Sequence, residues 1–169
     1  MGDEAVSGPA LRPALPADAP RLAEIFREAV LGLAVDDYDE DQREAWASAA
    51  EDVGAFAQRL AAMLTLVATR DGVPMAFACL EDNDMVAMLY VHPDAAGQGY
   101  AKALVDALER LAFARGKAKI TTDASDVSRG FFEHRGYVAT QRNSVMRAGE
   151  WLANTTMVKE LTSQGKPLQ

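Results

Sequence analysis

The chain has 169 residues, 49% of them hydrophobic and 25% charged, and a formal net charge of −8 at pH 7. This length favours one domain with a sizeable core. No apolar run approaches the roughly 18 residues of a membrane helix, and the N-terminus lacks a secretion pattern, so we expect a cytoplasmic protein without a membrane partner. The acidic balance argues against nucleic acid and suits a cationic substrate better than an acidic one. With one cysteine, Cys79, and two distant histidines, we expect no disulfide and no metal ion.

The first elements are a short strand and a helix. Ala10–Ala14 is predicted as an edge strand, because Pro13 and Pro16 would interrupt a central ladder. A helix over residues 18–32 follows, with Asp18 as its expected N-cap. Its apolar stripe is Leu22, Ile25, Phe26, Ala29, Val30 and Leu33.

Residues 36–46 hold six acids within nine residues before an alanine-rich stretch. One interpretation is a solvated helix start, where acids stabilise the helix dipole. The other is a helix over an acceptor pocket, with Tyr38 and Trp46 as walls and one acid facing an amine. A further helix is predicted over Asp52–Met63.

From Leu64 the hydrophobic period changes to that of strands. Leu64–Thr69 and Val73–Leu80 flank Asp71-Gly72, a strong hairpin signal. After a polar turn, the apolar run Met85–Val91 forms the next strand. These three strands are predicted to form an antiparallel meander whose last strand is central.

A loop with two glycines joins this central strand to a helix. The strand stops at His92-Pro93, Gly97 and Gly99 follow, and a helix begins at once and stops at Gly116. The helix is predicted from the spacing of its apolar residues, which are Ala101, Leu104, Val105, Leu108, Leu111 and Ala112. Bare N–H groups at the positive end of a helix bind anions, so this loop is predicted to hold a diphosphate.

Two kinds of glycine-rich nucleotide site do not fit this loop. The Gly-Lys-Ser/Thr of a P-loop is absent, and Lys102 stands where a dinucleotide fingerprint needs a small residue. What fits is Val-x-Pro, a spacer and Gly-x-Gly-x-Ala, given by Val91, Pro93, Gly97, Gly99 and Ala101. In this the sequence resembles the GCN5-related N-acetyltransferase (GNAT) family. Its end segment Gly149–Lys159, with Tyr38 and the stretch Gln42–Trp46, is similar to a YafP-like bacterial subgroup of acetyltransferases. The family usually has Arg or Gln where this chain has Ala96, a departure that removes a side chain but no backbone donor.

Four more elements complete the chain. Lys119–Asp123 follows a helical crossover and should lie parallel to the central strand. Ser125 is expected to cap a helix that ends at Arg135-Gly136. Tyr137–Met146 and Trp151–Leu161 are predicted as the last two strands.

These elements predict one domain over residues 10–162, with tails at 1–9 and 163–169. Its fold class is α/β (α+β). We expect a mixed, mostly antiparallel twisted sheet with a central splayed pair of parallel strands and helices on both faces. The resemblance implies that this is the acyl-CoA N-acyltransferase fold.

The resemblance also implies how acetyl-CoA would bind. The pantetheine arm would fill the gap between the splayed strands, paired with the backbone of Tyr90 and Val91. The N–H groups from Ala96 to Lys102 would hold the pyrophosphate, and the Val91 N–H would face the thioester oxygen. The full set of expected coenzyme A residues is Tyr90, Val91, Ala96, Gly97, Gln98, Gly99, Tyr100, Ala101, Lys102, Ser125, Phe131 and Phe132.

No catalytic acid can be named from the sequence. Phe131, Phe132, Glu133, Gly136 and Tyr137 match a family pattern in which a tyrosine commonly stands where this chain has Phe132. Phenylalanine cannot donate a proton to the leaving thiolate, although a thiol with a pKa of about 8.5 also leaves unaided. As a base, Asp123 at the end of the parallel strand is a better candidate than the acids of the turn at residues 81–84.

The function implied is N-acetyl transfer from acetyl-CoA to an amine of a small molecule or peptide, directly within a ternary complex. Tyr38, Trp46 and Trp151 are the expected substrate-binding residues, and exposed sheet edges leave a homodimer open. The alternative is a non-catalytic acyl-CoA-binding or protein-interaction module of the same fold, motivated by Phe132 and Ala96. A nicotinamide-dinucleotide enzyme is a third, weaker interpretation.

Overall fold

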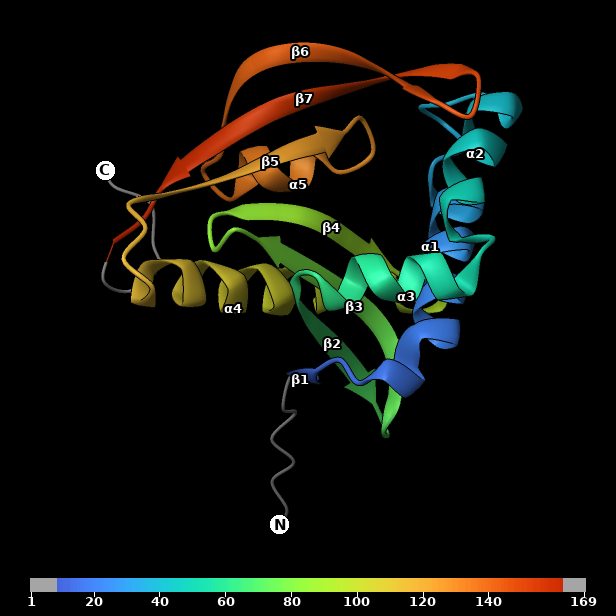
Figure 1. Cartoon of the computed structure of the whole chain (residues 1–169). Coiled ribbons are helices and arrows are strands. Elements are labelled where there is room, and N and C mark those ends of the chain that lie inside the picture. The colour runs from blue at the N-terminus through green and yellow to red at the C-terminus, as the bar shows by residue number, and fades with distance from the viewer. Residues whose placement is uncertain (1–8, 163–169) are drawn as a thin grey trace.

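The computed structural model describes residues 9–162, so the expected tails at 1–9 and 163–169 lie outside the described residues, apart from Pro9. One sheet has the strand order β1-β2-β3-β4-β5-β7-β6, with helices on both faces (Figure 1). The strands are β1 (Ala10–Pro13), β2 (Leu64–Arg70), β3 (Val73–Glu81), β4 (Met85–Val91), β5 (Lys119–Ser125), β6 (Val138–Arg147) and β7 (Glu150–Glu160). The helices are α1 (Ala19–Leu33), α2 (Glu40–Ala47), α3 (Val53–Ala61), α4 (Tyr100–Ala114) and α5 (Arg129–His134). No helix within residues 9–162 is long and apolar enough to span a membrane.

The sheet is mixed as predicted. Neighbouring strands are antiparallel except β4 and β5, which are parallel. Alternate residues of β3 face the two helical layers, as the period of a strand requires. Ala76, Ala78 and Leu80 pack in a core with α4 and α5, whereas Phe77 and Cys79 pack in a second core with α1 and α3.

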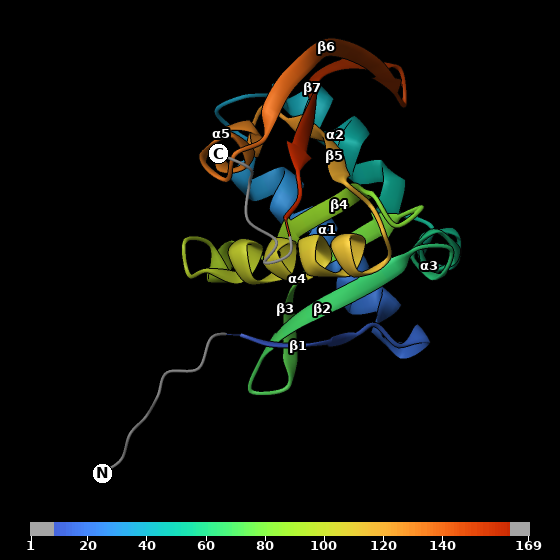
Figure 2. The same ribbon diagram turned by 90° about the vertical axis from the view of Figure 1, so that its left-hand side faces the viewer.

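The parallel pair is joined at one end only. β4 and β5 pair at Met85 with Thr121 and at Val86 with Thr122, and Thr122 Oγ1 donates to the Val86 carbonyl at 2.9 Å. Directly afterwards the β3–β4 register skips Ala87, and such a bulge bends and twists its strand. The sheet therefore splits beyond Val86 into a half formed by β1–β4 and a half formed by β5, β7 and β6 (Figure 2). The splayed pair is confirmed.

A buried ionic cluster ties α4 to the second half. Glu109 of α4 accepts hydrogen bonds from Lys159 of β7 at 2.9 Å, from Arg135 at 3.2 Å and from the Tyr137 hydroxyl at 2.8 Å. Glu109 and Lys159 are 1% and 3% exposed. Burial, reinforced by the charge of Glu109, raises the pKa of the Tyr137 phenol, which stays a donor. The cluster therefore links the helix that packs on β3 and β4 to the second half of the sheet.

The sequence predicts the N-cap of α1 wrongly but places a helix start correctly in the acidic segment before α2. Asp18 does not cap α1: its carboxylate accepts from the Leu15 N–H at 2.7 Å and pairs with Arg12, because a short 3-10 turn precedes the helix. That prediction was wrong. The acidic segment does start a helix. The Asp39 carboxylate caps α2 by accepting from the Gln42 N–H at 2.8 Å, and the Gln42 side-chain oxygen accepts from the Asp39 N–H at 2.9 Å.

Candidate active site

The glycine loop leaves main-chain donors free at the start of α4. Gly97 and Gly99 have φ of 74° and 88°, a left-handed conformation that costs other residues roughly 1–2 kcal/mol. The Ala96 N–H donates to the Pro93 carbonyl at 3.2 Å, and the Ala103 N–H donates to that of Gly99 at 3.1 Å. Within residues 9–162, no protein group accepts from the N–H groups of residues 97–102. These groups suit an anion, whereas the Ala96 N–H, which was expected among the donors, is already bonded within the loop.

A large cavity of about 310 Å³ lies in the split of the sheet. Its floor consists of the diverging stretches 85–90 of β4 and 122–125 of β5. Its walls come from the other elements at this end of the molecule: Tyr38, Trp46, Ala49, Arg59, Val145, Arg147 and Leu152. It therefore combines the bulged strand with the segment between α1 and α3 and with the β6–β7 hairpin.

A small cavity of about 180 Å³ adjoins the large one. It lies between α1, the end of β4, the start of α4 and α5, and its apolar lining includes Val30, Leu33, Val91, Ala101, Val127 and Phe131. The residues that line both cavities are Trp46, Leu89, Tyr90, Ser125 and Ser128. The small cavity therefore lies between the start of α4, which lines it through Ala101, and the large cavity.

Tyr38 and Trp46 both reach the large cavity, as expected. The Tyr38 hydroxyl donates to the Ala153 carbonyl at 2.7 Å and accepts from the Asp126 N–H at 2.9 Å. Burial raises the pKa of Tyr38, so the phenol stays protonated. Its two hydrogen bonds attach it to β7 and to the loop after β5. Trp46 Nε1 donates to the Tyr90 hydroxyl at 3.2 Å, and burial raises the pKa of Tyr90 to about 12.

Trp151 does not reach either cavity. Trp151 is 58% exposed, and its carbonyl accepts a hydrogen bond from Gln42 Nε2 of α2 at 2.8 Å. Leu152, the next residue, lines the large cavity. Neighbouring side chains of a strand point to opposite faces, so the predicted aromatic wall is one residue out of register.

The other expected residues divide between the two cavities. Asp123 lines the large cavity, and its Oδ1 accepts from Thr156 Oγ1 at 2.6 Å. Phe132 also lines it but is 1% exposed and packs against Phe131 and Tyr137. At the shared wall the Ser125 and Ser128 hydroxyls lie 3.1 Å apart.

Around the glycine loop, the structure gives the remaining expected residues different surroundings. Gln98 accepts from Arg70 at 3.2 Å, Tyr100 is buried in the core below α4, and Lys102 pairs with Asp106 at 3.1 Å. Their side chains belong to the loop and helix.

The charged residues Arg59 and Arg147 line the large cavity but were not predicted from the sequence. Arg59 lies on α3 and Arg147 ends β6. Neither belongs to a motif, and their meeting at one cavity depends on the tertiary arrangement. Glu81, which the sequence offers only as a weaker acid, lines the same cavity.

Comparison with known proteins agrees with this geometry. The model of the acetyltransferase (GNAT) domain matches residues 34–161. The "Uncharacterized N-acetyltransferase YafP" of Escherichia coli (strain K12) is 30% identical over 142 residues, which cover 84% of this chain and 89% of that protein.

Solved structures are similar over nearly the whole chain. A GCN5-related N-acetyltransferase from Rhodopseudomonas palustris, whose description also carries the words "Aminotransferase, Class-II", is 56% identical with a TM-score of 0.91, covering 95% of this chain and 100% of that one. The structure of yncA from Salmonella typhimurium, with its cofactor acetyl-CoA, is 25% identical with a TM-score of 0.61, covering 92% and 95%. The chain therefore belongs to the GNAT family of acetyltransferases.

Proposed function

We propose that this chain transfers the acetyl group directly to an amine of a small molecule or peptide held in the large cavity. The observation that carries this proposal is that the two cavities share lining residues on both diverging strands, Leu89 and Tyr90 of β4 and Ser125 of β5. Coenzyme A would enter from the glycine loop through the small cavity, and the amine from the other side. Two reactants held at such a junction react without the entropy cost of meeting in solution.

The main chain would hold the coenzyme. The free N–H groups of residues 97–102 suit its pyrophosphate, and the apolar small cavity suits its pantetheine arm. The His92 N–H donates to the Met75 carbonyl of β3 at 2.8 Å, so in an extended strand the Val91 N–H points the other way, toward the split. There it can stabilise the negative charge that develops on the thioester oxygen.

The thioester of acetyl-CoA is already reactive toward an amine, so the side chains need only assist proton transfer. An alkylammonium with a pKa of about 10.4 must lose a proton before its nitrogen can attack. Asp123 lines the cavity and would take this proton through water. The new N–C bond then replaces the C–S bond, the attached nitrogen loses its second proton to water, and the sulfur departs as a thiolate that solvent protonates. Phe132 cannot supply that proton, and the Tyr38 hydroxyl already donates to Ala153.

Direct transfer is supported by the place of the chain's one cysteine. Cys79 is fully buried in the core below α1 and α3 and lines neither cavity. Burial raises the pKa of its thiol to about 11, so it is a poor nucleophile. Initial-rate kinetics should give intersecting lines, and the mass of the chain should not change after incubation with acetyl-CoA alone. Parallel lines or a gain of one acetyl group would contradict direct transfer.

The absence of a proton donor at Phe132 favours a second candidate, a non-catalytic acyl-CoA-binding module. Thiol release from acetyl-CoA across a panel of amines separates the two. A rise in melting temperature with acetyl-CoA, but no thiol release with any amine, would favour the second candidate. A rise with NAD and none with coenzyme A would instead favour a dinucleotide enzyme.

Homodimerisation is a separate part of the proposal. β6 is the outer strand of its half of the sheet, and Val138 and Met146 expose apolar side chains on it. An exposed edge of this kind can pair with a second chain. Analytical ultracentrifugation should show a dimer that a charged residue at Val138 dissociates.

A further inference from the structure

We propose that the acceptor amine also carries a carboxylate or phosphate group, which Arg59 and Arg147 bind. This inference rests on the proposed function, because it describes the second substrate of that reaction. It concerns the two basic side chains of the large cavity, which neither the loop motif nor the transfer chemistry uses. The acids Glu81 and Asp123 complete the charged lining of that cavity.

The two arginines converge from separate parts of the chain. Arg59 projects from α3, and Arg147 lies at the turn of the β6–β7 hairpin, yet both line the large cavity. Both also lie close enough to the buried Tyr90 hydroxyl for their charges to oppose the effect of burial on its pKa. Tyr90 belongs to the wall shared by the two cavities. The two exposed positive charges therefore line the cavity within electrostatic reach of the wall where we put the reacting groups.

Neither arginine has a carboxylate partner within residues 9–162. Some arginines of the chain are paired with a carboxylate, as Arg12 is with Asp18 and Arg142 with Asp126, and others, such as Arg27, donate only to carbonyl groups within the described residues. Arg147 donates to the Met146 carbonyl at 3.0 Å, which leaves its charge unbalanced. In a chain with 25 acids and 17 basic residues, two unpaired guanidinium groups at one cavity are available to a ligand.

The chemistry of these side chains fits an oxyanion. A guanidinium group binds carboxylate or phosphate through two parallel hydrogen bonds. Asp123 lines the same cavity and suits an ammonium group, so a molecule with both charges would satisfy both sets. The volume of about 310 Å³ matches a small molecule. The net charge of −8 favours a cationic substrate, but it describes the whole chain, whereas Arg59 and Arg147 set the positive charge within this cavity.

Thiol release with matched acceptors tests this inference. The panel contains the α-amino acids, β-alanine, their amides, aminoalkylphosphonates, and simple alkylamines and diamines, at saturating acetyl-CoA. An anionic amine should exceed its own amide at least tenfold in kcat/KM. Arg59→Gln and Arg147→Gln should each lower this preference about 10- to 100-fold, mainly through KM, because each removes a charge-assisted contact to the bound acceptor. The affinity for acetyl-CoA should not change.

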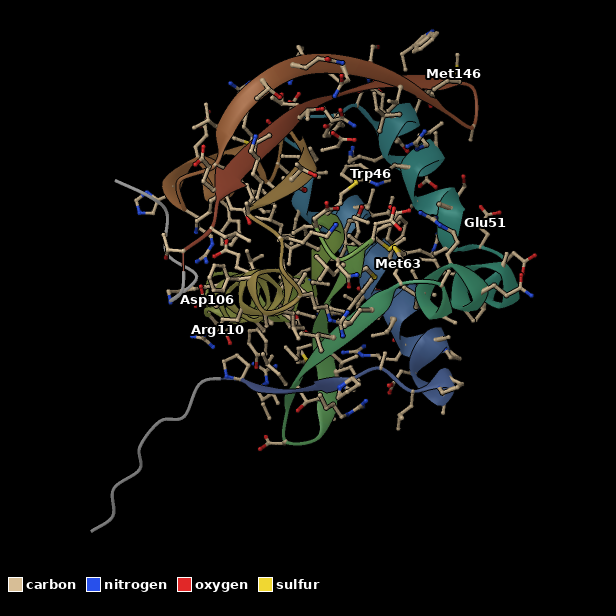
Figure 3. The ribbon with its side chains drawn as sticks, turned by 60° about the vertical axis from the view of Figure 1, so that its left-hand side comes forward. Trp46, Glu51, Met63, Asp106, Arg110 and Met146 are labelled. Atoms are coloured by element: carbon tan, nitrogen blue, oxygen red, sulfur yellow. The ribbon has the colours of Figure 1, made fainter. Side chains whose placement is uncertain are left out.

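Arg110→Gln is the matched control, because Arg110 is exposed on α4 and lines neither cavity (Figure 3). It should behave as the unchanged chain. Equal rates for amides and anionic amines, or arginine variants that lower both equally, would overturn the inference while leaving acetyl transfer intact. If no amine is acetylated, the proposed function fails instead. In that case calorimetry of the same amines binding to the coenzyme A complex tests the inference. Anionic amines should bind more tightly than their amides, and Arg59→Gln and Arg147→Gln should remove this difference in Kd.

Discussion

Replacing Gly99 with leucine should abolish most coenzyme binding and leave the fold intact. Gly99 has a φ of 88°, and a Cβ there would meet nothing within 4 Å. Strain should therefore cost about 1–2 kcal/mol of unfolding free energy, or roughly 2–8 °C in melting temperature for a chain of this size. The same open space is where we place the phosphates. Losing even one hydrogen bond to a charged phosphate costs about 1.5–3 kcal/mol, which raises the Kd for acetyl-CoA about 10- to 150-fold.

Gly116→Leu provides the matched control for strain. Gly116 has a φ of 87°, also faces open space, and lies just beyond the far end of α4. Both variants should lose similar stability in thermal unfolding, but only Gly99→Leu should lose affinity in calorimetric titration with acetyl-CoA. An unchanged Kd in Gly99→Leu, or an equal loss in Gly116→Leu, would refute the placement of the pyrophosphate.

Four further predictions concern the base, the pocket wall, the ionic cluster and acid stability. Asp123→Asn should lower kcat/KM about 10²- to 10⁴-fold at neutral pH. The loss in kcat/KM should be smaller at high pH, where the free amine is abundant. The same loss in kcat/KM at every pH would exclude Asp123 as the base. Trp46→Ala should raise KM for the acceptor, whereas Trp151→Ala should not, because only Trp46 lines the large cavity. Glu109→Gln should cost about 3–5 kcal/mol in denaturant unfolding, because it strands the buried Lys159 charge, whereas Glu24→Gln at an exposed pair should cost about 0–1 kcal/mol. The hydrogen bond from Arg12 lowers the pKa of Asp18. Asp18 therefore contributes to the free energy of unfolding above its unfolded-state pKa near 4, and this contribution is lost as pH falls through the lower folded-state pKa. Asp18→Asn should make the loss of stability at acid pH less steep in denaturant unfolding.

The sequence predicts what is local to one strand, turn or helix. The run from Met85 through the two glycines to Ala112 combines a strand, a left-handed turn and an amphipathic helix, and each has a residue pattern of its own. The structure has all three at the expected places. The single hairpin signal at Asp71-Gly72 likewise sets the β2–β3 register.

What the sequence misses depends on register and tertiary contacts. Trp151 and Leu152 are neighbours, and only the pairing of β6 with β7 decides which one faces the cavity. Arg59 and Arg147 carry no pattern, because their proximity arises when the β6–β7 hairpin comes to lie beside α3 at the large cavity. Asp18 shows a third cause, since a proline-started 3-10 turn places its carboxylate toward Leu15 instead of α1.

A crystal structure of the chain with acetyl-CoA tests the central claim most directly. The account predicts the pyrophosphate against the N–H groups of residues 97–102 and the pantetheine arm along Tyr90 and Val91. The acetyl carbon should then lie at the wall shared by both cavities, beside Ser125. Electron density for the coenzyme elsewhere, with the space between β4 and β5 closed by side chains, would contradict it.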